Sequence, residues 1–354
     1  MRAVDYLVHR GDLHRTSLAS GERVCGEGQI LVMVEHFALS ANTMTYAVMG
    51  DAGRYWDFFP APPPWGRIPV WGFGTIVASD CAGVRPGDRL YGCFPMSTCT
   101  TMKPEKVRPS GLVDASSQRA HLSPVYNYYV RVAPAGQQTY ARETEQMLLR
   151  PLFYASFLAH DLLDDMDRVA CIVVTSASSK TAIGLAHRLR LDKTDRGTVI
   201  GLTSDANRSF VTTLGIYDRV CGYAELDSLP RATTTIFDLS GSATLVASLA
   251  DRLGDNLARC CLVGYTHWAE TTLAEQRDAR IERFSAPDRM RTRTRDWGAA
   301  EFETRFNAAF ESFAAFSRGW LRIVEGAGPD AVENAYAMIS QNRVRPDEGH
   351  ILSV

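Results

Sequence analysis

Hydrophobic positions follow two different spacings along the chain, and the spacing changes near residue 140. In the first part, apolar residues alternate with polar ones or form short blocks bounded by glycine and proline, as in 1–9, 29–38 and 69–79. Alternation with a period of two is the pattern of half-buried strands, and the glycines inside 69–79 suggest a bulge or a barrel corner. This part is therefore predicted to be rich in β-structure, with an aromatic, proline-rich loop at 57–66.

A second pattern runs from 169 to 283, where short apolar runs alternate with amphipathic stretches. Strands are expected at 169–174, 198–203, 219–221, 235–239 and 259–264, and helices near 180–191, 205–214 and 242–253. Continuous apolar strands that alternate with helices are typical of parallel sheets covered on both faces. The pattern predicts a doubly wound α/β unit.

The segments outside these two patterns complete the expected elements. A helix is expected at 141–163, while residues 100–135 carry no regular spacing and are expected to be irregular. Helical spacing recurs at 299–325 and 329–341, and residues 349–354 alternate like a strand.

The composition is that of a globular protein with two domains. The 354 residues exceed the size of one ordinary core, and 45% are hydrophobic against 22% charged. A net charge of -2 gives no electrostatic attraction to nucleic acid or to an anionic membrane. No apolar run reaches the roughly 20 residues of a membrane span, and the N-terminus lacks the apolar core of a signal peptide. A cytoplasmic protein without nucleic-acid or membrane partners is expected.

The eight cysteines show no metal-binding pattern. They form no Cys-x-x-Cys pair, and none has the spacing to a histidine that common zinc sites use. Those at 171, 221, 260 and 261 lie in apolar, strand-like runs. The cysteines are expected to be small buried hydrophobic residues.

The segment 169–188 contains the most specific motif of the chain. A buried strand leads through the polar turn 175–181 directly into a helix, as in dinucleotide-binding units, where the pyrophosphate lies at a helix N-terminus. The glycines of the usual fingerprint are missing from this turn. It offers instead hydroxyl groups and one of the four lysines of the chain, in the residues Ser176, Ser178, Ser179, Lys180 and Thr181. Either the turn still binds a dinucleotide phosphate, or the site has decayed and Lys180 is a solvated residue.

Several motifs occur in an order that resembles the medium-chain dehydrogenase/reductase superfamily, nearest to its zinc-independent, quinone-oxidoreductase-like branch. They are the strand and turn at 29–50, the run Val84-Arg-Pro-Gly-Asp-Arg-Leu-Tyr-Gly92, and the run Leu214-Gly-Ile-Tyr-Asp-Arg-Val-Cys-Gly-Tyr223. The resemblance implies an α/β protein with an N-terminal GroES-like β-barrel catalytic domain and a Rossmann-type domain with a doubly wound parallel sheet. It places the catalytic domain at 1–140 and 285–354, and the dinucleotide-binding domain at 141–284.

The chain resembles still more closely a subgroup known only as a domain of unknown function. The matching segments are 46–50, 54–60, 176–182, 286–288 and 295–298. That subgroup has no established reaction, so this likeness narrows the fold and leaves the chemistry open.

The positions that hold catalytic zinc in the alcohol dehydrogenases of the superfamily carry other residue types here. Ser40, Ala41 and Asn42 follow the first strand of the motif, and the later position reads Trp71-Gly-Phe-Gly74. The four-cysteine lobe for structural zinc is also missing from the sequence. Without thiolate or imidazole ligands at these places, no metal is expected and the chemistry is predicted to be zinc-independent.

The residues after the strand at 198–203 favour NADPH over NADH. NAD-binding units place an acidic residue at the tip of this strand to bind the ribose diol, whereas here Thr203 and Ser204 end it. A hydroxyl pair and the guanidinium of Arg208 suit a 2′-phosphate, and Arg208 lies close to where the resembling branch carries a basic phosphate ligand. Alternatively, Asp205 is a helix N-cap and Arg208 an exposed helix residue. Contacts to the nicotinamide ribose are expected at Ser240, Gly241, Gly264 and Tyr265.

The resemblance also indicates a proton donor and a substrate surface. Tyr46 matches a tyrosine common in this turn of the branch, and a phenol with a pKa of about 10 is a donor at neutral pH. Asn42 and Thr43 are expected to position the reacting groups. An apolar substrate is expected to contact Tyr55, Trp56, Tyr126 and Tyr129. Ordinary packing remains the alternative for each aromatic residue.

Together these expectations describe an NADPH-dependent, zinc-independent reductase of a conjugated carbonyl substrate: an enone, an enoyl thioester or a quinone. The alternative is a non-redox lyase or isomerase, or a non-catalytic binding protein, on the same scaffold with a degenerate cofactor turn. A homodimer is expected by analogy with the branch. The arginines at 289, 291, 293 and 295 either bind an anionic substrate or form a solvated face.

Overall fold

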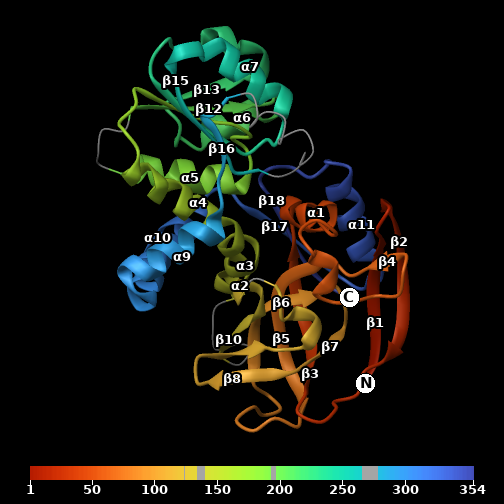
Figure 1. Cartoon of the computed structure of the whole chain (residues 1–354). Coiled ribbons are helices and arrows are strands. Elements are labelled where there is room, and N and C mark those ends of the chain that lie inside the picture. Colours follow the sequence, from red (N-terminus) through yellow and green to blue (C-terminus); the bar gives the residue numbers. More distant parts are fainter. Residues whose placement is uncertain (123, 134–139, 193–196, 265–277) are drawn as a thin grey trace. The chain divides into compact units, whose positions relative to one another are not determined.

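The computed structural model describes residues 1–122, 124–133, 140–192, 197–264 and 278–354 (Figure 1). The chain divides into two compact units. Unit 1 comprises Met1–Leu148 and Arg322–Val354, and unit 2 comprises Leu149–Leu321. The C-terminal segment thus returns to the N-terminal unit, while unit 2 is one continuous stretch of chain.

Unit 1 is built mainly from antiparallel strands. Among the described residues of this unit, nine strands form one sheet, in which β7 pairs with β3 beside the path β17-β18-β3-β5-β6-β10-β9-β8, and a smaller sheet has the order β2-β1-β4. The strands are β1 (Arg2–His9), β2 (Asp12–Glu22), β3 (Ile30–Leu39), β4 (Trp65–Gly66), β5 (Pro69–Ser79), β6 (Arg89–Pro95), β7 (Cys99–Met102), β8 (Pro104–Arg108), β9 (Gly111–Asp114), β10 (Tyr128–Val132), β17 (Arg322–Ala327) and β18 (Glu348–Ser353). Its helices are α1 (Ala41–Val48), α2 (Pro124–Asn127), α3 (Tyr140–Leu148) and α11 (Pro329–Ser340), with short 3₁₀ turns η1 (Tyr55–Asp57) and η2 (Ser117–Arg119).

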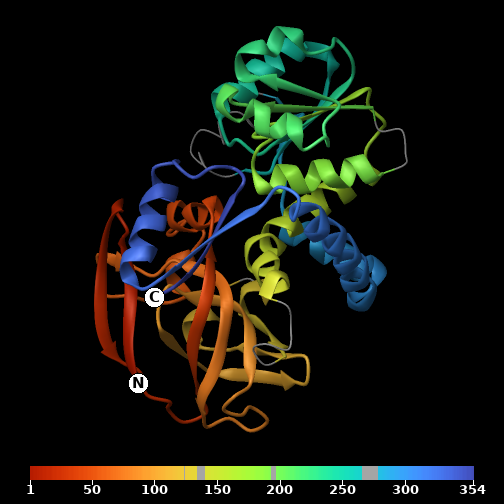
Figure 2. The same ribbon diagram turned by 180° about the vertical axis from the view of Figure 1, so that it is seen from behind.

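The C-terminal strands complete the sheet of unit 1, as Figure 2 shows from behind. Strand β18 pairs antiparallel with β3, with His350 opposite Leu39, and parallel with β17. Ile351 and Leu352 of β18 are buried, so this strand contributes directly to the core. The return of the chain is therefore an integral part of the first fold.

Residues 100–135 were expected to be irregular, and this expectation is wrong. The segment supplies β8, β9 and β10 and most of β7, which extend the large sheet. These strands are short, and β8 is largely exposed, with the sequence Pro-Glu-Lys-Val-Arg. Short strands at the edge of a sheet carry little hydrophobic alternation, so periodicity could not reveal them.

Unit 2 contains a six-stranded sheet in the order β13-β12-β11-β14-β15-β16, and every neighbouring pair is parallel. This order confirms the expected fold class, with its doubly wound parallel sheet. The strands are β11 (Cys171–Val174), β12 (Thr198–Thr203), β13 (Arg219–Gly222), β14 (Thr234–Asp238), β15 (Leu257–Leu262) and β16 (Ile281–Arg283). The helices are α4 (Arg150–Leu162), α5 (Lys180–Leu191), α6 (Asp205–Thr213), α7 (Ala243–Leu253), α9 (Ala286–Trp297) and α10 (Ala299–Ser317), with 3₁₀ turns η3 (Leu163–Asp165), η4 (Tyr223–Ser228) and η5 (Gly254–Asn256).

The strands of this sheet are buried on both faces. Cys171 and Val173 of β11 belong to the core cluster formed with α7, whereas Ile172 and Val174 point to the opposite face because side chains alternate along a strand. Helix α5 packs closely against α4, and the Ser156 hydroxyl of α4 donates to the Thr181 carbonyl at 2.7 Å. This packing fixes the start of α5, where the polar turn 175–181 leads into the helix. This turn is called the phosphate turn.

Two helical expectations differ from the structure. The expected helix at 141–163 is interrupted at Leu149, because Pro151 near the start of α4 cannot continue the hydrogen bonding of α3. The expected helix at 299–325 ends at Ser317, and Arg322–Ala327 forms β17 instead. The pairing of β17 with β18 overrides the helical spacing of these residues.

The segment 285–321 lies in unit 2, although it was expected with the N-terminal part. Arg289 and Arg293 of α9 form ion pairs with Asp161 of α4 and with Asp165. Four phenylalanines of α10, at 302, 306, 310 and 313, are buried. Arg289 and Arg293 therefore fasten α9 to α4 through ion pairs, whereas Arg291 and Arg295 are exposed, as the solvated-face alternative expected.

No helix among the described residues is both long enough and apolar enough to cross a lipid bilayer.

Candidate functional site

The phosphate turn joins β11 to α5 at the carboxyl edge of the parallel sheet. Ser176 has a φ of 49°, in the left-handed region that normally favours glycine. The Ala177 N–H donates to the Leu202 carbonyl at 2.9 Å, and the Tyr217 hydroxyl donates to the Ala177 carbonyl at 3.1 Å. The backbone thus adopts a glycine-like conformation at Ser176, and contacts with neighbouring elements hold it there.

The serine hydroxyls of the turn are engaged with the protein. The Ser178 hydroxyl accepts from Asn207 Nδ2 at 3.1 Å. The Ser179 hydroxyl accepts from the Ala182 N–H at 3.2 Å and is the N-cap of α5. Ser176 hydrogen-bonds the Tyr223 hydroxyl. The three serine side chains of the turn are therefore held by partners within the protein.

The first turn of α5 remains suited to an anion. Lys180 is the first residue of the helix and is half-buried, and Thr181 follows it. Amides of a first helical turn have no acceptor within the helix, and the helix dipole adds a partial positive charge there. Backbone amides together with the Lys180 ammonium and the Thr181 hydroxyl are the groups of this turn that fit a phosphate.

Arg208 lies at the carboxyl ends of β12 and β13, as its sequence position suggested. Its Nη2 lies 2.8 Å from Glu225 Oε2 and 3.1 Å from Asp205 Oδ1, and its Nη1 donates to Glu225 Oε1 at 3.1 Å. These two carboxylates raise the pKa of the Arg208 guanidinium, with Glu225 contributing most. Ser204 is the N-cap residue of α6, so Asp205 is the first helical residue rather than the expected N-cap.

Asp238, at the end of β14, organises the loops where nicotinamide contacts were expected. One carboxylate oxygen accepts from the Thr175 hydroxyl at 2.5 Å and from the Ser240 hydroxyl at 2.6 Å, and the other accepts from the Gly241 N–H at 3.0 Å. The carbonyl of Asp238 accepts from the Gly264 N–H at 2.9 Å. A single buried acid therefore shapes three turns at the same sheet edge.

Sequence reasoning had passed over Asp238. An acidic residue inside the apolar run 234–239 was the signal that could have revealed it, because a buried carboxylate needs several partners. Tyr265, which was expected beside Gly264, lies outside the described residues.

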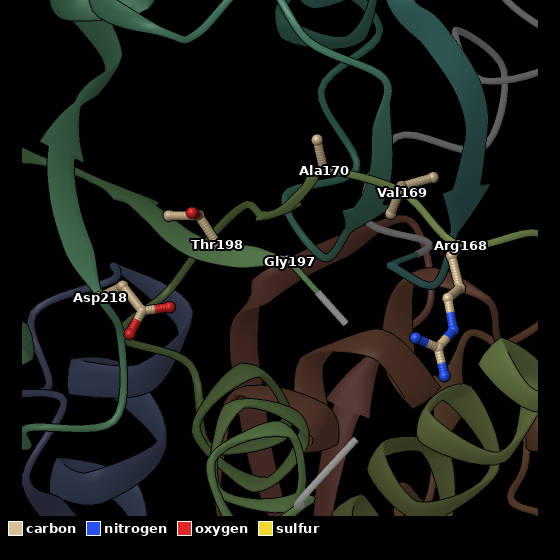
Figure 3. A pocket seen from close by; sticks show the side chains of 6 residues that line it. All are labelled: Arg168, Val169, Ala170, Gly197, Thr198 and Asp218. Atoms are coloured by element: carbon tan, nitrogen blue, oxygen red, sulfur yellow. The ribbon is translucent and has the colours of Figure 1, made fainter. Parts of the chain in front are cut away.

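A separate hollow lies at the amino ends of the strands of the same sheet (Figure 3). It is lined by residues just before and at the start of β11 and β12 and by Asp218, whose carboxylate accepts from the Val199 N–H at 2.8 Å. The lining residues are Arg168, Val169, Ala170, Gly197, Thr198 and Asp218. Ligands of open parallel sheets bind at the carboxyl ends of the strands, so this hollow at the amino ends is not the candidate cofactor site.

Three tyrosines meet in unit 1. Tyr46 lies on α1, Tyr55 on η1 and Tyr126 on α2. Ring centroids of Tyr46 and Tyr55 are 4.7 Å apart, and those of Tyr46 and Tyr126 are 6.0 Å apart with perpendicular planes. The hydroxyls of Tyr55 and Tyr126 are 3.4 Å apart. This group is called the tyrosine cluster below.

The Tyr46 hydroxyl has polar neighbours despite its burial. Trp71 Nε1 donates to it at 3.2 Å, and Asn42 hydrogen-bonds it from the same helix, one turn earlier. Burial raises the pKa of Tyr46 above its ordinary value, and it does the same for Tyr55 and Tyr126. All three phenols are consequently protonated at neutral pH, as a proton donor requires.

A buried arginine, Arg119, fastens the segments that carry Tyr55 and Tyr126. It is fully buried, and its guanidinium donates to the Tyr126 carbonyl at 2.6 Å and to Asn127 Oδ1 at 3.0 Å. The same group lies over the Phe58 ring, 5.2 Å from its centroid. Sequence reasoning missed Arg119. No local signal marks it, because its contacts with Tyr126, Asn127 and Phe58 arise from packing.

Three residues expected at the active site belong to the structure's interior instead. The Thr43 hydroxyl accepts from the Ser40 N–H at 3.2 Å and thereby caps α1. Trp56 is 2% exposed, with its ring against Gly50 and Gly66, and Tyr129 is completely buried and receives a hydrogen bond from Arg119. These environments favour the packing alternative for Trp56 and Tyr129 and a capping role for Thr43.

Within the described part of the chain, no three histidine, cysteine, aspartate or glutamate residues are arranged so that they could hold a metal ion.

Comparison with protein families gives a match over residues 37–345 to the family described as Protein of unknown function (DUF2855). The chain belongs to this family. No curated protein sequence matches the chain significantly.

Solved structures share the fold of this DUF2855 protein over its full length. CurA from Vibrio vulnificus in complex with NADPH has a TM-score of 0.63 at 12% identity, with 100% of this chain and 99% of CurA covered. The quinone oxidoreductase from Coxiella burnetii has a TM-score of 0.56 at 14% identity, with both chains covered completely. The Etr1p/NADP/crotonyl-CoA complex has a TM-score of 0.57 at 9% identity, also with complete coverage of both chains.

These identities are low, so the likeness concerns the fold. It confirms the fold that the resemblance to the medium-chain dehydrogenase/reductase superfamily implied for this DUF2855 chain.

Proposed function

We propose that this DUF2855 protein is an NADPH-dependent, zinc-independent reductase of a conjugated carbonyl compound: an enone, an enoyl thioester or a quinone. The observation that carries the proposal is the phosphate turn, where the serine side chains are tied back and the capped N-terminus of α5 is left facing the carboxyl edge of the sheet. CurA, a structure of the same fold, was solved with NADPH.

The chain's own residues fit the two ends of this cofactor. The first turn of α5, with Lys180 and Thr181, would hold the pyrophosphate, and Ser178 and Ser179 would shape that turn. Arg208 beside Ser204 would bind the 2′-phosphate. The loops fixed by Asp238 would contact the nicotinamide ribose through the residues Ser240, Gly241, Gly264 and Tyr265.

The chemistry divides between cofactor and protein. When bound, NADPH supplies a hydride. Reduction of a conjugated substrate places negative charge on its carbonyl oxygen, and the protonated Tyr46 hydroxyl would stabilise that charge and then donate its proton. Asn42 and Trp71 would orient this hydroxyl, since both hydrogen-bond it. No protein group in this scheme requires a metal.

The tyrosine cluster also indicates the substrate surface. Tyr55 and Tyr126 are partly exposed, whereas Trp56 and Tyr129 are buried. Aromatic rings with a few hydroxyls suit an apolar molecule that has one polar carbonyl end. We assign substrate contact to Tyr55 and Tyr126. The homodimer, from analogy with the branch, and the cytoplasmic location, expected from the sequence pattern, remain proposals.

The proposal is tested by titrating the purified protein with NADPH and with NADH while following the quenching of tryptophan fluorescence. We expect NADPH to bind, and Lys180→Ala to weaken it, because a phosphate loses its only side-chain cation in the turn. Lys103→Ala, an exposed lysine in unit 1, is the matched control and should leave binding unchanged.

Two outcomes would reject parts of this proposal. If neither dinucleotide binds at millimolar concentration, a non-redox or non-catalytic protein becomes the better interpretation. If NADPH binds but is not oxidised with cyclohexenone, crotonyl-CoA or benzoquinone, the cofactor assignment stands and the substrate class is wrong.

A further inference from the structure

The Arg208 side chain is held by a carboxylate clasp at the place proposed for the 2′-phosphate. Glu225 engages both terminal nitrogens, at 2.8 Å and 3.1 Å, and Asp205 adds a contact at 3.1 Å. We call these residues, Arg208, Glu225 and Asp205, the arginine clasp. Any phosphate that binds Arg208 has to compete with two negative groups.

The arginine clasp lies against the backbone turn at Gly222. Glu225 Oε2 accepts from the Gly222 N–H at 2.9 Å, which closes the turn between β13 and η4. A Cβ atom at position 222 would collide with the Arg208 guanidinium, so the glycine leaves the space that Arg208 occupies. Arg208 thus packs against the same turn that holds Glu225 through the Gly222 N–H.

The clasp is nevertheless weak enough to open. The side chains of Arg208 and Glu225 are 36% and 44% exposed. Exposed ion pairs contribute little binding free energy, and salt screens them. A phosphate dianion binds a guanidinium more strongly than a carboxylate does, since it offers more charge in the same bidentate geometry. The ribose phosphate of NADPH can therefore displace Glu225, whereas the ribose hydroxyl of NADH cannot.

We propose that Glu225 sets the preference between the two dinucleotides, by acting as an internal competitor for the Arg208 guanidinium that a 2′-phosphate must displace. This inference rests on the proposed function, because it assumes that the dinucleotide lies along this sheet edge. The two residues act on NADPH binding in opposite directions: Arg208 strengthens it and Glu225 weakens it.

The test compares Glu225→Gln with the wild-type chain. Glutamine keeps an oxygen that can accept from the Gly222 N–H and removes the charge, so the turn is retained. Titrations with NADPH, NADH and adenosine 2′-monophosphate should show tighter binding of the two phosphorylated ligands by about two- to fivefold, the range for an exposed ion pair, and unchanged NADH binding. The gain should shrink at high salt.

Asp227→Asn is the matched control. Asp227 lies in the same 3₁₀ turn, is fully exposed, and faces Arg252 instead of Arg208. Its substitution removes the same charge two residues away and should leave all three affinities unchanged. The double variant Arg208→Ala/Glu225→Gln should lose the gain of Glu225→Gln, because the two residues act through one contact.

The outcomes separate this inference from the proposed function. Wild-type binding of NADPH with no gain in Glu225→Gln overturns the competitor role and leaves the reductase proposal standing. Weaker NADH binding in Glu225→Gln also overturns it, since Glu225 would then hold the ribose diol. A wild-type chain that binds neither dinucleotide nor adenosine 2′-monophosphate overturns both.

Discussion

At the scale of single residues, the Tyr46 hydroxyl owes its chemical character to neighbours on different elements. Asn42 comes from the same helix, but Trp71 comes from β5, Tyr55 from η1 and Tyr126 from α2. Burial among these groups keeps the phenol protonated while hydrogen bonds orient it. This environment keeps the hydroxyl protonated for the proposed role of Tyr46, and we expect its loss to affect turnover selectively.

We expect Tyr46→Phe to lower turnover about a hundredfold or more, the usual contribution of a general acid, with little change in NADPH affinity. The measurement is steady-state NADPH oxidation with the best substrate of the enone, thioester and quinone panel. Tyr336→Phe is the control, because it removes a hydroxyl that donates to the Leu13 carbonyl between α11 and the N-terminal strands. Unaltered turnover in Tyr46→Phe would reject Tyr46 as the donor.

His187 offers a test of stability against pH. Its ring is buried between α5 and α10, stacked on Phe316 with centroids 4.7 Å apart, and burial lowers the pKa of His187 to about 4. The unfolded chain binds this proton at about pH 6.5, so it holds more protons than the folded chain between the two values. The free energy of unfolding should therefore fall as the pH falls from about 6.5 toward 4.

The variant His187→Gln removes this titration and should flatten the acid side of the stability profile. Urea unfolding at several pH values gives the comparison. A wild-type profile that matches the variant over the same pH range would show that His187 does not titrate as its burial implies.

At the scale of elements, helix α5 depends on a cap that is also part of the phosphate turn. The Ser179 hydroxyl accepts from the Ala182 N–H, so its removal exposes a first-turn amide and loosens the turn. Loss of a serine N-cap costs typically about 1 kcal/mol. The chain contains a second helix with the same cap, at Ser242 of α7, whose hydroxyl accepts from the Leu245 N–H at 3.3 Å.

The two caps make a matched pair of variants. Ser179→Ala and Ser242→Ala should each lower the free energy of unfolding by about 1 kcal/mol, as read from denaturant titration. Ser179→Ala alone should also weaken NADPH binding, because its helix N-terminus is the proposed phosphate site. Equal NADPH affinity in both variants would separate α5 from the cofactor.

At the scale of the whole molecule, the two units differ in how the chain builds them. Unit 2 is the continuous stretch 149–321, whereas unit 1 needs the C-terminal segment, because β18 lies between β17 and β3. Ile351 of β18 and Val332 and Tyr336 of α11 are buried in the first fold. Cutting the chain should therefore affect the two units unequally.

The fragment 149–321 should fold alone and bind NADPH, since it carries every proposed cofactor residue. The fragment 1–148 should remain unfolded or aggregate, since β3 loses its pairing with β18 and exposes an apolar edge. Circular dichroism, thermal unfolding and NADPH titration of both fragments provide the check. A folded 1–148 fragment would contradict the structural role given to the returning strands.

The sequence by itself determined the local elements wherever a periodic pattern was strong. The expected helix at 180–191 and the strand at 198–203 coincide with α5 and β12, because burial on fixed faces imposes periods that any single sequence displays. The polar phosphate turn was also legible, since its residues are contiguous. The short edge strands could not be predicted, because strand pairing and not periodicity forms them. The break at Leu149 could not be predicted either, because one proline interrupts an otherwise helical spacing.

The tertiary structure decided which side chains meet. Glu225 reaches Arg208 from 17 residues away, and Arg119 joins the segments of Phe58 and Tyr126 in the interior. Such contacts depend on how strands and loops pack, and no spacing along the chain encodes them. The sequence thus determined that the chain has a Rossmann-type fold with an unusual turn. Packing decided which of its polar and aromatic residues are available for chemistry.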